Sequence, residues 1–284
     1  MYRIVNVEPN SIEHMEFRKG KIGSSIAADI MGVGYNTPLQ RWNMEIFGNN
    51  TPPNPAMLRG TALEPVARKK VCDLLGIDYR PVVIENVENP ILIASLDGFC
   101  EVDGFTHILE IKCPNAERHA LAVQGKVPEI YYPQLQHIML VSGVDFMIYA
   151  SFNGEDVEIV RVEKDEKYCE KLLAEEMAFY KLIVDLKEPK PTEKDWAEIK
   201  DPVALEKAQR YIELSKSLKE AEKELDDLES DLKGFFSHPR NRVGDLSASK
   251  IVRQGAIDYK AIPELSSVNL EPYRKAPVSF WKFS

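Results

Sequence analysis

Hydrophobic and polar residues alternate along the chain with two periods, and these periods predict where helices and strands lie. Apolar residues that recur every three to four positions predict helices, and short apolar or alternating runs between turn residues predict strands. The predicted helices cover a short segment starting at Ser11, and then residues 22–32, 37–47, 56–75, 129–142, 166–186 and 202–236. The predicted strands cover residues 80–85, 91–99, 106–112, 146–152 and 157–162, with two further short strands at 249–253 and 255–259.

Signals at the ends of two helices make these predictions more specific. Ser24 and Ser25 precede an Ala/Ile run, and we expect them to cap a helix that Gly32 ends. The helix over 56–75 is expected to end at Gly76. Its apolar residues are expected to form one stripe, made of Leu58, Ala62, Leu63, Val66, Ala67, Val71 and Leu74.

The order of the elements indicates an α/β fold of the α+β type, in which helices flank a mixed central sheet. The Asp103-Gly104 and Asn153-Gly154 pairs are typical of hairpin turns and join neighbouring strands. We expect three segments: a core over residues 1–190, a long charged helical segment over 191–236, and a small β-rich C-terminal appendage over 237–284.

The long charged helix carries an apolar seam whose spacing is not a perfect heptad. The seam consists of Leu205, Ala208, Ile212, Leu218, Leu225, Leu228 and Leu232. Such a helix either packs in cis on the helix before it or forms a coiled coil with another chain. The sequence leaves both arrangements open.

Composition and charge limit the classes of function. A hydrophobic fraction of 44% in 284 residues is enough for a sizeable core, and the net charge of -9 argues against a simple basic nucleic-acid coat. A nuclease with an acidic metal site remains compatible with that charge. The N-terminus has no signal-peptide pattern and no stretch reaches the ~18 apolar residues of a membrane span, so we expect a soluble cytoplasmic protein. The four cysteines show no C-x-x-C spacing, which favours reduced thiols.

Carboxylates and a lysine lie on two neighbouring predicted strands. Glu110 and Lys112 are two residues apart and therefore share one face, whereas Ile111 points into the core and leaves its carbonyl available as a metal ligand. Antiparallel pairing would bring Asp97 beside Glu110. Two or three carboxylates suffice to bind Mg²⁺, and a nearby lysine stabilises charge that develops on a phosphate. This set predicts metal-dependent phosphodiester hydrolysis.

The same residues also fit a plain interpretation, an exposed strand face with a Glu–Lys pair and a solvated Asp. Two helices favour a functional site. Glu64 lies on the helix before the strands between Arg59 and Arg68, which are phosphate-binding candidates or ion-pair partners. Gln134 opens the helix after the strands and is expected to donate to a phosphate oxygen or to hold the lysine. We interpret His137 as a helix-surface or packing residue, because one histidine beside hard-metal carboxylates is not a zinc set.

In chain order, these motifs resemble the PD-(D/E)xK nuclease superfamily and, within it, the YqaJ-type viral recombinase or lambda-exonuclease-like family. The resemblance covers residues 15–160 and implies a restriction-endonuclease-like core. One departure is Leu96, which stands where the superfamily has its name-giving proline. The matching strings are Arg18 with residues 22–25, Arg59-Gly60 with Glu64, residues 95–98, Leu109-Glu110-Ile111-Lys112-Cys113-Pro114 and Tyr132-Pro133-Gln134-Leu135-Gln136.

The resemblance implies roles for the residues at the centre of the cluster. Asp97 and Glu110 would bind Mg²⁺, for which Mn²⁺ would substitute, together with the carbonyl of Ile111. Glu64 would lie at the edge of the metal site as a ligand or water contact, and Lys112 would assist the nucleophilic water.

The resemblance also implies a substrate and partners. Gln134 would organise the site, Arg18 and Ser25 match positions that hold the 5′-phosphate of a DNA end, and Arg59 is a further phosphate-binding candidate. The implied activity is 5′→3′ digestion of linear duplex DNA, leaving 3′ single strands for phage-type recombination. Implied partners are duplex DNA ends, further copies of the chain in a ring trimer, and a single-strand annealing protein. The implied setting is the bacterial cytoplasm, with a phage or prophage gene.

Two other functions stay open at this point. The first is a Cas4-like or endonucleolytic enzyme of the same fold, although scattered cysteines argue against the iron–sulfur site that Cas4-like enzymes carry. The second is a non-catalytic DNA-end-binding module, against which the intact carboxylate–lysine set argues.

Overall fold

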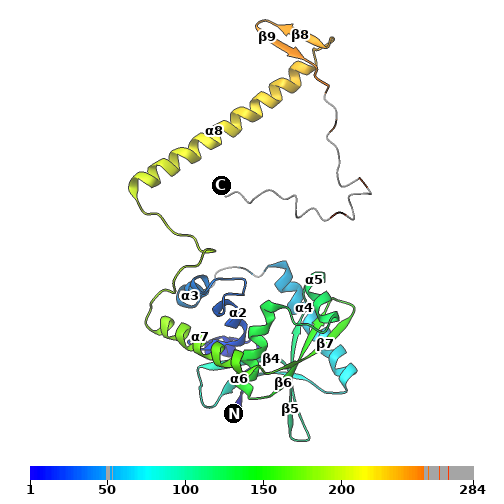
Figure 1. Ribbon diagram of the computed structural model, residues 1–284, viewed down its shortest axis with the longest axis vertical. Helices are drawn as coiled ribbons and strands as arrows, with labels where there is room; N and C mark the ends of the chain where they lie inside the picture. The colour runs from blue at the N-terminus through cyan, green and yellow to red at the C-terminus, as the bar shows by residue number, and fades with distance from the viewer. Residues whose placement is uncertain (49–51, 53, 253–254, 256–261, 263–267, 269–284) are drawn as a thin grey trace. The chain divides into compact units, whose positions relative to one another are not determined.

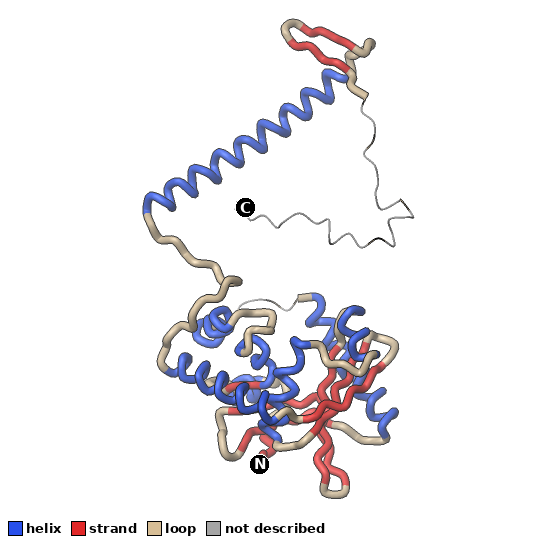
Figure 2. Tube along the Cα trace, in the orientation of Figure 1, coloured by secondary structure: helices blue, strands red, loops and turns tan. Residues whose placement is uncertain are grey.

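The computed structural model describes residues 1–48, 52, 54–252, 255, 262 and 268. The chain divides into two compact units, Met1–Glu198 and Ile199–Ser284, and each is described by itself. In the first unit, one mixed sheet carries helices on its faces (Figure 1 and Figure 2). The predicted fold class, a mixed sheet flanked by helices, is therefore confirmed.

Within the described residues, seven strands form the sheet of the first unit in the order β1-β3-β4-β5-β6-β7, and β2 pairs with β4 off this path. Neighbours from β1 to β5 are antiparallel, β5 and β6 are parallel, and β6 and β7 are antiparallel again. The strands are β1 (Tyr2–Val5), β2 (Ile22–Gly23), β3 (Arg80–Asn86), β4 (Leu92–Val102), β5 (Phe105–Lys112), β6 (Phe146–Phe152) and β7 (Val157–Glu163).

The helices of this unit begin and end at residues with clear capping chemistry. Thr37 forms a reciprocal capping box with Gln40, and Gly76 ends α4 in the left-handed conformation that favours glycine. The α-helices are α1 (Ile12–Phe17), α2 (Ala27–Ile30), α3 (Pro38–Phe47), α4 (Pro55–Leu75), α5 (Ala116–Val123), α6 (Tyr132–Ser142) and α7 (Glu166–Val184), and two 3-10 turns are η1 (Ser24–Ile26) and η2 (Glu129–Tyr131).

Helices cover both faces of the sheet, and each face has its own core. One core joins α3, α6 and α7 to the sheet and includes Trp42, Leu135 and Phe179. The other joins α4 to the sheet through Ala67 and Val71, which meet side chains such as Ile111, Ala150 and Phe152. Because alternate strand residues point to opposite faces, β5 sends Ile108 into the first core and Leu109 and Ile111 into the second.

Two local predictions about the helices are wrong. Ser24 and Ser25 do not cap a helix, because Ile22–Gly23 forms a strand beside β4 and a 3-10 turn follows before α2. The expected apolar stripe of α4 is split, since Leu58 is 58% exposed whereas Ala67 is fully buried. At about 100° per residue these two side chains lie on opposite sides of the helix. The pattern also gave no indication of β1 or α5.

The second unit contains the helix α8 (Pro202–Lys233) and the hairpin of β8 (Arg240–Val243) and β9 (Leu246–Ser249). None of the side chains of α8 is buried. The structure therefore does not decide whether the apolar seam packs on the preceding helix or forms a coiled coil with another chain. The strand predicted at 249–253 is wrong for residues 250–252, which follow β9 without regular structure, and Arg253 lies outside the described residues. The strand predicted at 255–259 lies outside them except for Gly255. Across the part of the chain that is described, no helix is both long and apolar enough to cross a membrane.

Candidate active site

The centre of the candidate site lies where β4 and β5 stop pairing. Their ladder ends at Gly98 and Leu109, and the same register places Asp97 opposite Glu110. Asp97 therefore lies inside β4. The strand predicted over residues 91–99 had placed it near the end of the strand. Its Oδ2 accepts a hydrogen bond from the backbone N–H of Ile111 at 2.8 Å. Because the N–H and C=O of one strand residue point to the same side, the carbonyl of Ile111 faces this opening too.

Gly98, next to Asp97, is required by close packing of the strand. A Cβ at this position would lie 2.9 Å from the Cβ of Leu109 and 2.9 Å from the Cβ of Tyr79. No side chain fits there without displacing its neighbours. The position of the Asp97 carboxylate therefore depends on a glycine beside it.

Glu110 is the residue around which the other polar groups of the site are arranged. Its Oε1 accepts hydrogen bonds from Nζ of Lys112 at 2.6 Å and from Nε2 of Gln134 at 2.6 Å. Gln134 therefore orients the carboxylate and does not hold the lysine. The second oxygen, Oε2, is buried and has no hydrogen-bond partner. A buried carboxylate oxygen without a partner is costly, and a bound cation would satisfy it.

Burial raises the pKa of both carboxylates at the centre of the site. Burial and the nearby Asp97 raise the pKa of Glu110 to about 8, although Lys112 opposes this shift. Burial also raises the pKa of Asp97, against the opposing effects of Lys112 and the Ile111 N–H. Burial lowers the pKa of Lys112, but the Glu110 and Asp97 carboxylates outweigh it, so the lysine stays cationic. Two facing carboxylates beside one lysine suit a divalent cation.

Glu64 approaches the site from α4 but is paired with Arg68. The Arg68 guanidinium donates to Glu64 and, through Nε, to the backbone carbonyl of Asp97 at 2.5 Å. Burial and Asp97 raise the pKa of Glu64, and Arg68 opposes the rise. Among the described residues, no three or more His, Cys, Asp or Glu side chains are grouped to hold a metal ion. The ligands on offer are therefore Asp97, Glu110 and the Ile111 carbonyl, which fits Mg²⁺ completed by water.

The predicted phosphate-binding residues are not gathered in one place by side-chain contacts. Arg18 caps the C-terminus of α1 and Ser25 lies in η1, and both are exposed without a side-chain hydrogen bond to another described residue. Helix α1, whose C-terminus Arg18 caps, contacts β4 through His14 Nε2, which lies 3.0 Å from Ser95 Oγ. Arg59 instead donates to the carbonyl of Asn153 at 2.6 Å, in the turn after β6.

A row of alternating cationic and aromatic side chains leads away from Lys112, and sequence reasoning missed it. Nζ of Lys112 lies 5.7 Å from the ring centre of Tyr131. The Arg118 guanidinium lies 5.9 Å from the same ring and 5.4 Å from that of Tyr35, to whose hydroxyl it donates at 2.5 Å. Tyr35 is 73% exposed, so the row reaches the surface. Only folding brings these residues together, since no short motif contains them.

Two other sequence interpretations can be compared with the structure. His137 is fully buried, where Nδ1 meets Glu176 at 2.6 Å and Nε2 meets the Ile93 carbonyl at 2.9 Å, which agrees with a packing role. Cys72, Cys100, Cys113 and Cys169 are all free thiols in the described part of the chain. They form no ligand group there, so an iron–sulfur site of the Cas4-like kind has no support.

Comparisons with known proteins identify a family and two similar structures. Residues 13–145 match the family described as the YqaJ-like viral recombinase domain. The crystal structure of LHK-Exo in complex with dAMP is 26% identical, with a TM-score of 0.54, and the match covers 62% of this chain and 94% of that one. A structure of the alkaline exonuclease LHK-Exo from Laribacter hongkongensis also matches with 26% identity over 62% and 94% of the two chains, with a TM-score of 0.52.

A phage-related exonuclease from Haemophilus somnus 129PT is 18% identical over 58% of this chain and 94% of its own, with a TM-score of only 0.44. No curated protein has a significant sequence match to this chain.

Proposed function

We propose that the chain is a Mg²⁺-dependent DNA exonuclease, because residues 13–145 match the family described as the YqaJ-like viral recombinase domain. It would hydrolyse phosphodiester bonds at the ends of linear duplex DNA. The likeness to LHK-Exo, a protein described as an alkaline exonuclease, supports the choice of nuclease over other metal-dependent hydrolases.

The observation that carries the proposal is the buried, unpartnered Oε2 of Glu110 opposite Asp97. These two carboxylates and the Ile111 carbonyl would hold Mg²⁺, or Mn²⁺ in its place. The bound ion would polarise the scissile phosphate and lower the pKa of a bound water. Glu64 would contact the site through water, because Arg68 occupies its carboxylate.

The protein's own groups have separate tasks in this reaction. Gln134 holds the Glu110 carboxylate in one orientation by donating to its Oε1. Lys112 stays cationic at neutral pH and stabilises negative charge that develops on the phosphate. Its side chain is only 24% exposed, so bulk water screens that charge weakly. Removing the lysine charge is therefore expected to slow hydrolysis more than it weakens DNA binding.

The finer parts of the proposal rest on the family resemblance. We infer 5′→3′ digestion that leaves 3′ single strands for recombination with a single-strand annealing protein, and a ring trimer around the DNA. Arg18 and Ser25 would hold the 5′-phosphate, because their side chains are exposed and have no hydrogen-bond partner among the described residues. Arg59 would contribute its remaining donors beside the turn after β6.

Digestion of matched DNA substrates tests the proposal. Linear duplex with a 5′-phosphate, the same duplex without it, and a covalently closed circle are incubated with the chain and Mg²⁺. We expect digestion of linear DNA, faster with the 5′-phosphate, and none of the circle. Label at the 5′ or 3′ end reports the direction. Digestion of the circle at a similar rate would show that the chain is an endonuclease and not an exonuclease. No digestion of any substrate would refute the proposal that the chain is a nuclease.

A further inference from the structure

The second unit ends in a two-stranded ribbon whose two faces differ in chemistry. β8 and β9 pair antiparallel across a turn at Gly244, with Arg240 opposite Ser249 and Arg242 opposite Ser247. Because side chains alternate along a strand, these four residues share one face. The other face carries Asn241, Val243, Leu246 and Ala248.

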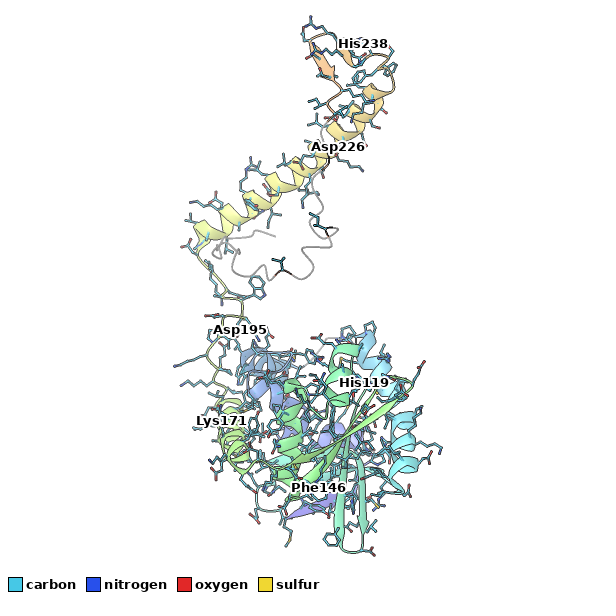
Figure 3. All side chains as sticks on the ribbon, turned by 45° about the vertical axis from the view of Figure 1, so that its right-hand side comes forward. His119, Phe146, Lys171, Asp195, Asp226 and His238 are labelled. Carbon is cyan, nitrogen blue, oxygen red and sulfur yellow. The ribbon has the colours of Figure 1, made fainter. Side chains whose placement is uncertain are left out.

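The arginine–serine face is the open one. All four of its residues are exposed, whereas Asn241 and Ala248 on the reverse face are partly covered. Neither Arg240 nor Arg242 forms a side-chain hydrogen bond or ion pair with another residue that the structure describes. Two guanidinium groups thus project from alternate positions of one strand, about 6.6 Å apart along it. His238, labelled in Figure 3, lies at the entry to the ribbon and bonds its backbone.

The sign of the charge changes between this ribbon and the helix before it. α8 carries nine acidic and six basic residues, one of them Asp226 in Figure 3. Residues 237–252 carry three basic residues, Arg240, Arg242 and Lys250, against the single acid Asp245 in the turn. In a chain of net charge -9, a local excess of positive charge on one open face is not explained by overall composition.

We propose that the Arg240–Arg242–Ser247–Ser249 face is a second DNA-binding site that contacts the phosphate backbone. Guanidinium forks bind phosphate oxygens with two parallel hydrogen bonds, and serine hydroxyls are common donors to the same groups. A two-stranded ribbon also fits a DNA groove in size. The proposed contacts are to phosphates and not to base edges, so binding would not depend on sequence, as suits an enzyme that acts on any DNA end.

This site rests on the proposed function in one respect, that DNA is the substrate. A second contact on the same chain keeps the DNA at high effective concentration after each cut. Loss of the ribbon would therefore lower DNA affinity and the number of nucleotides removed per encounter. It would leave the rate of hydrolysis at saturating DNA unchanged, because the ribbon takes no part in bond cleavage.

The salt dependence of DNA binding by the full chain tests the site. Binding of a labelled 5′-phosphorylated duplex is measured in EDTA, which prevents digestion, over a series of KCl concentrations. For Arg240→Ala/Arg242→Ala we expect the slope of log K against log salt to decrease in magnitude by about 2, one unit for each lost phosphate contact. Arg240→Lys/Arg242→Lys keeps both charges and should keep the slope.

A control variant separates this site from general charge effects. Lys219→Ala/Lys223→Ala removes two exposed cations from α8 and should retain the wild-type slope. If the arginine variant also has the wild-type slope, or loses no more than this control, the site is refuted. If the arginine variant aggregates and its slope does not change, the arginines protect the edge of the ribbon from pairing with other chains. That result would also refute the DNA-binding site. If the arginine variant shows the slope change but wild type digests no DNA, the proposed function is refuted and the ribbon site stands.

Discussion

Replacing Glu176 with Gln tests how firmly the helix that carries Gln134 is fixed to the sheet. Glu176 on α7 meets Nδ1 of His137 on α6 at 2.6 Å, and both side chains are fully buried. The other imidazole nitrogen lies 2.9 Å from the carbonyl oxygen of Ile93 on β4. That oxygen only accepts, so Nε2 carries a hydrogen. With Nδ1 donating to the carboxylate, His137 is a buried cation paired with Glu176.

The size of the effect follows from the burial of this pair. Removing one partner of a buried ion pair leaves an uncompensated charge and costs about 3–5 kcal/mol. The unit that contains the pair, Met1–Glu198, is of a size in which 1 kcal/mol shifts Tm by roughly 2–4 °C. We therefore expect Glu176→Gln to lower Tm by roughly 6–20 °C near pH 6.

The effect should also depend on pH in a defined direction. Burial lowers the pKa of His137, but Glu176 and the Ile93 carbonyl outweigh burial and raise it above the ordinary value. The pair therefore stabilises the fold fully below about pH 6.5, the pKa of an unfolded histidine. Its contribution decreases as pH rises through the higher folded pKa. The difference in Tm between wild type and Glu176→Gln should narrow at alkaline pH.

Thermal unfolding at a series of pH values measures both quantities. Glu175→Gln is the matched control, since it makes the same chemical change at the adjacent, exposed position of α7. We expect the control to unfold within a few degrees of wild type. The reasoning fails if Glu176→Gln is no less stable than Glu175→Gln, or if the difference between them widens as pH rises.

Three further predictions concern the site itself. Gly98→Ala would place a Cβ 2.9 Å from that of Tyr79. We therefore expect the free energy of unfolding, measured in urea, to decrease by about 1–3 kcal/mol. An unchanged midpoint of urea unfolding would contradict this close packing. In the metal-free chain Glu110 has a pKa of about 8 and holds a proton at neutral pH. Mn²⁺ affinity, measured by calorimetry, should therefore rise with pH up to about 8 and then level off. An affinity that does not change with pH would contradict this. Tyr35→Ala and Arg118→Ala should raise KM for duplex DNA about fivefold or more with little change in kcat. Wild-type KM in both variants would show that these two residues do not contact the DNA.

The sequence predicted the parts of the fold that depend on local patterns. The meander that carries Asp97 and Glu110 follows from three apolar runs and the Asp103-Gly104 turn, whose residues have φ values of 52° and 80°. The Glu110–Lys112 spacing places both side chains on one face whatever packs around them. These features need only strand periodicity and turn chemistry, so they were accessible without a structure.

The parts that failed depend on tertiary contacts. Ile22 looks like the start of a helix, but pairing with Leu92 makes it a strand. Leu58 has the same hydrophobicity as a core residue, yet it lies on the side of α4 away from the sheet. Tyr35 and Arg118 are 83 positions apart, so their hydrogen bond leaves no local trace in the sequence. Sequence spacing therefore located the carboxylates, Lys112 and Gln134. It did not locate the row of cationic and aromatic side chains that leads away from Lys112.

The rate of DNA digestion by a lysine variant tests the central claim most directly. Digestion of a labelled linear duplex in Mg²⁺ is compared for wild type, Lys112→Ala and Lys69→Ala, an exposed lysine on α4 that serves as the control. The account predicts digestion by wild type and Lys69→Ala at similar rates, a loss of about 100-fold or more in Lys112→Ala, and none in EDTA. Digestion by Lys112→Ala at the wild-type rate, or digestion by wild type in EDTA, would contradict it.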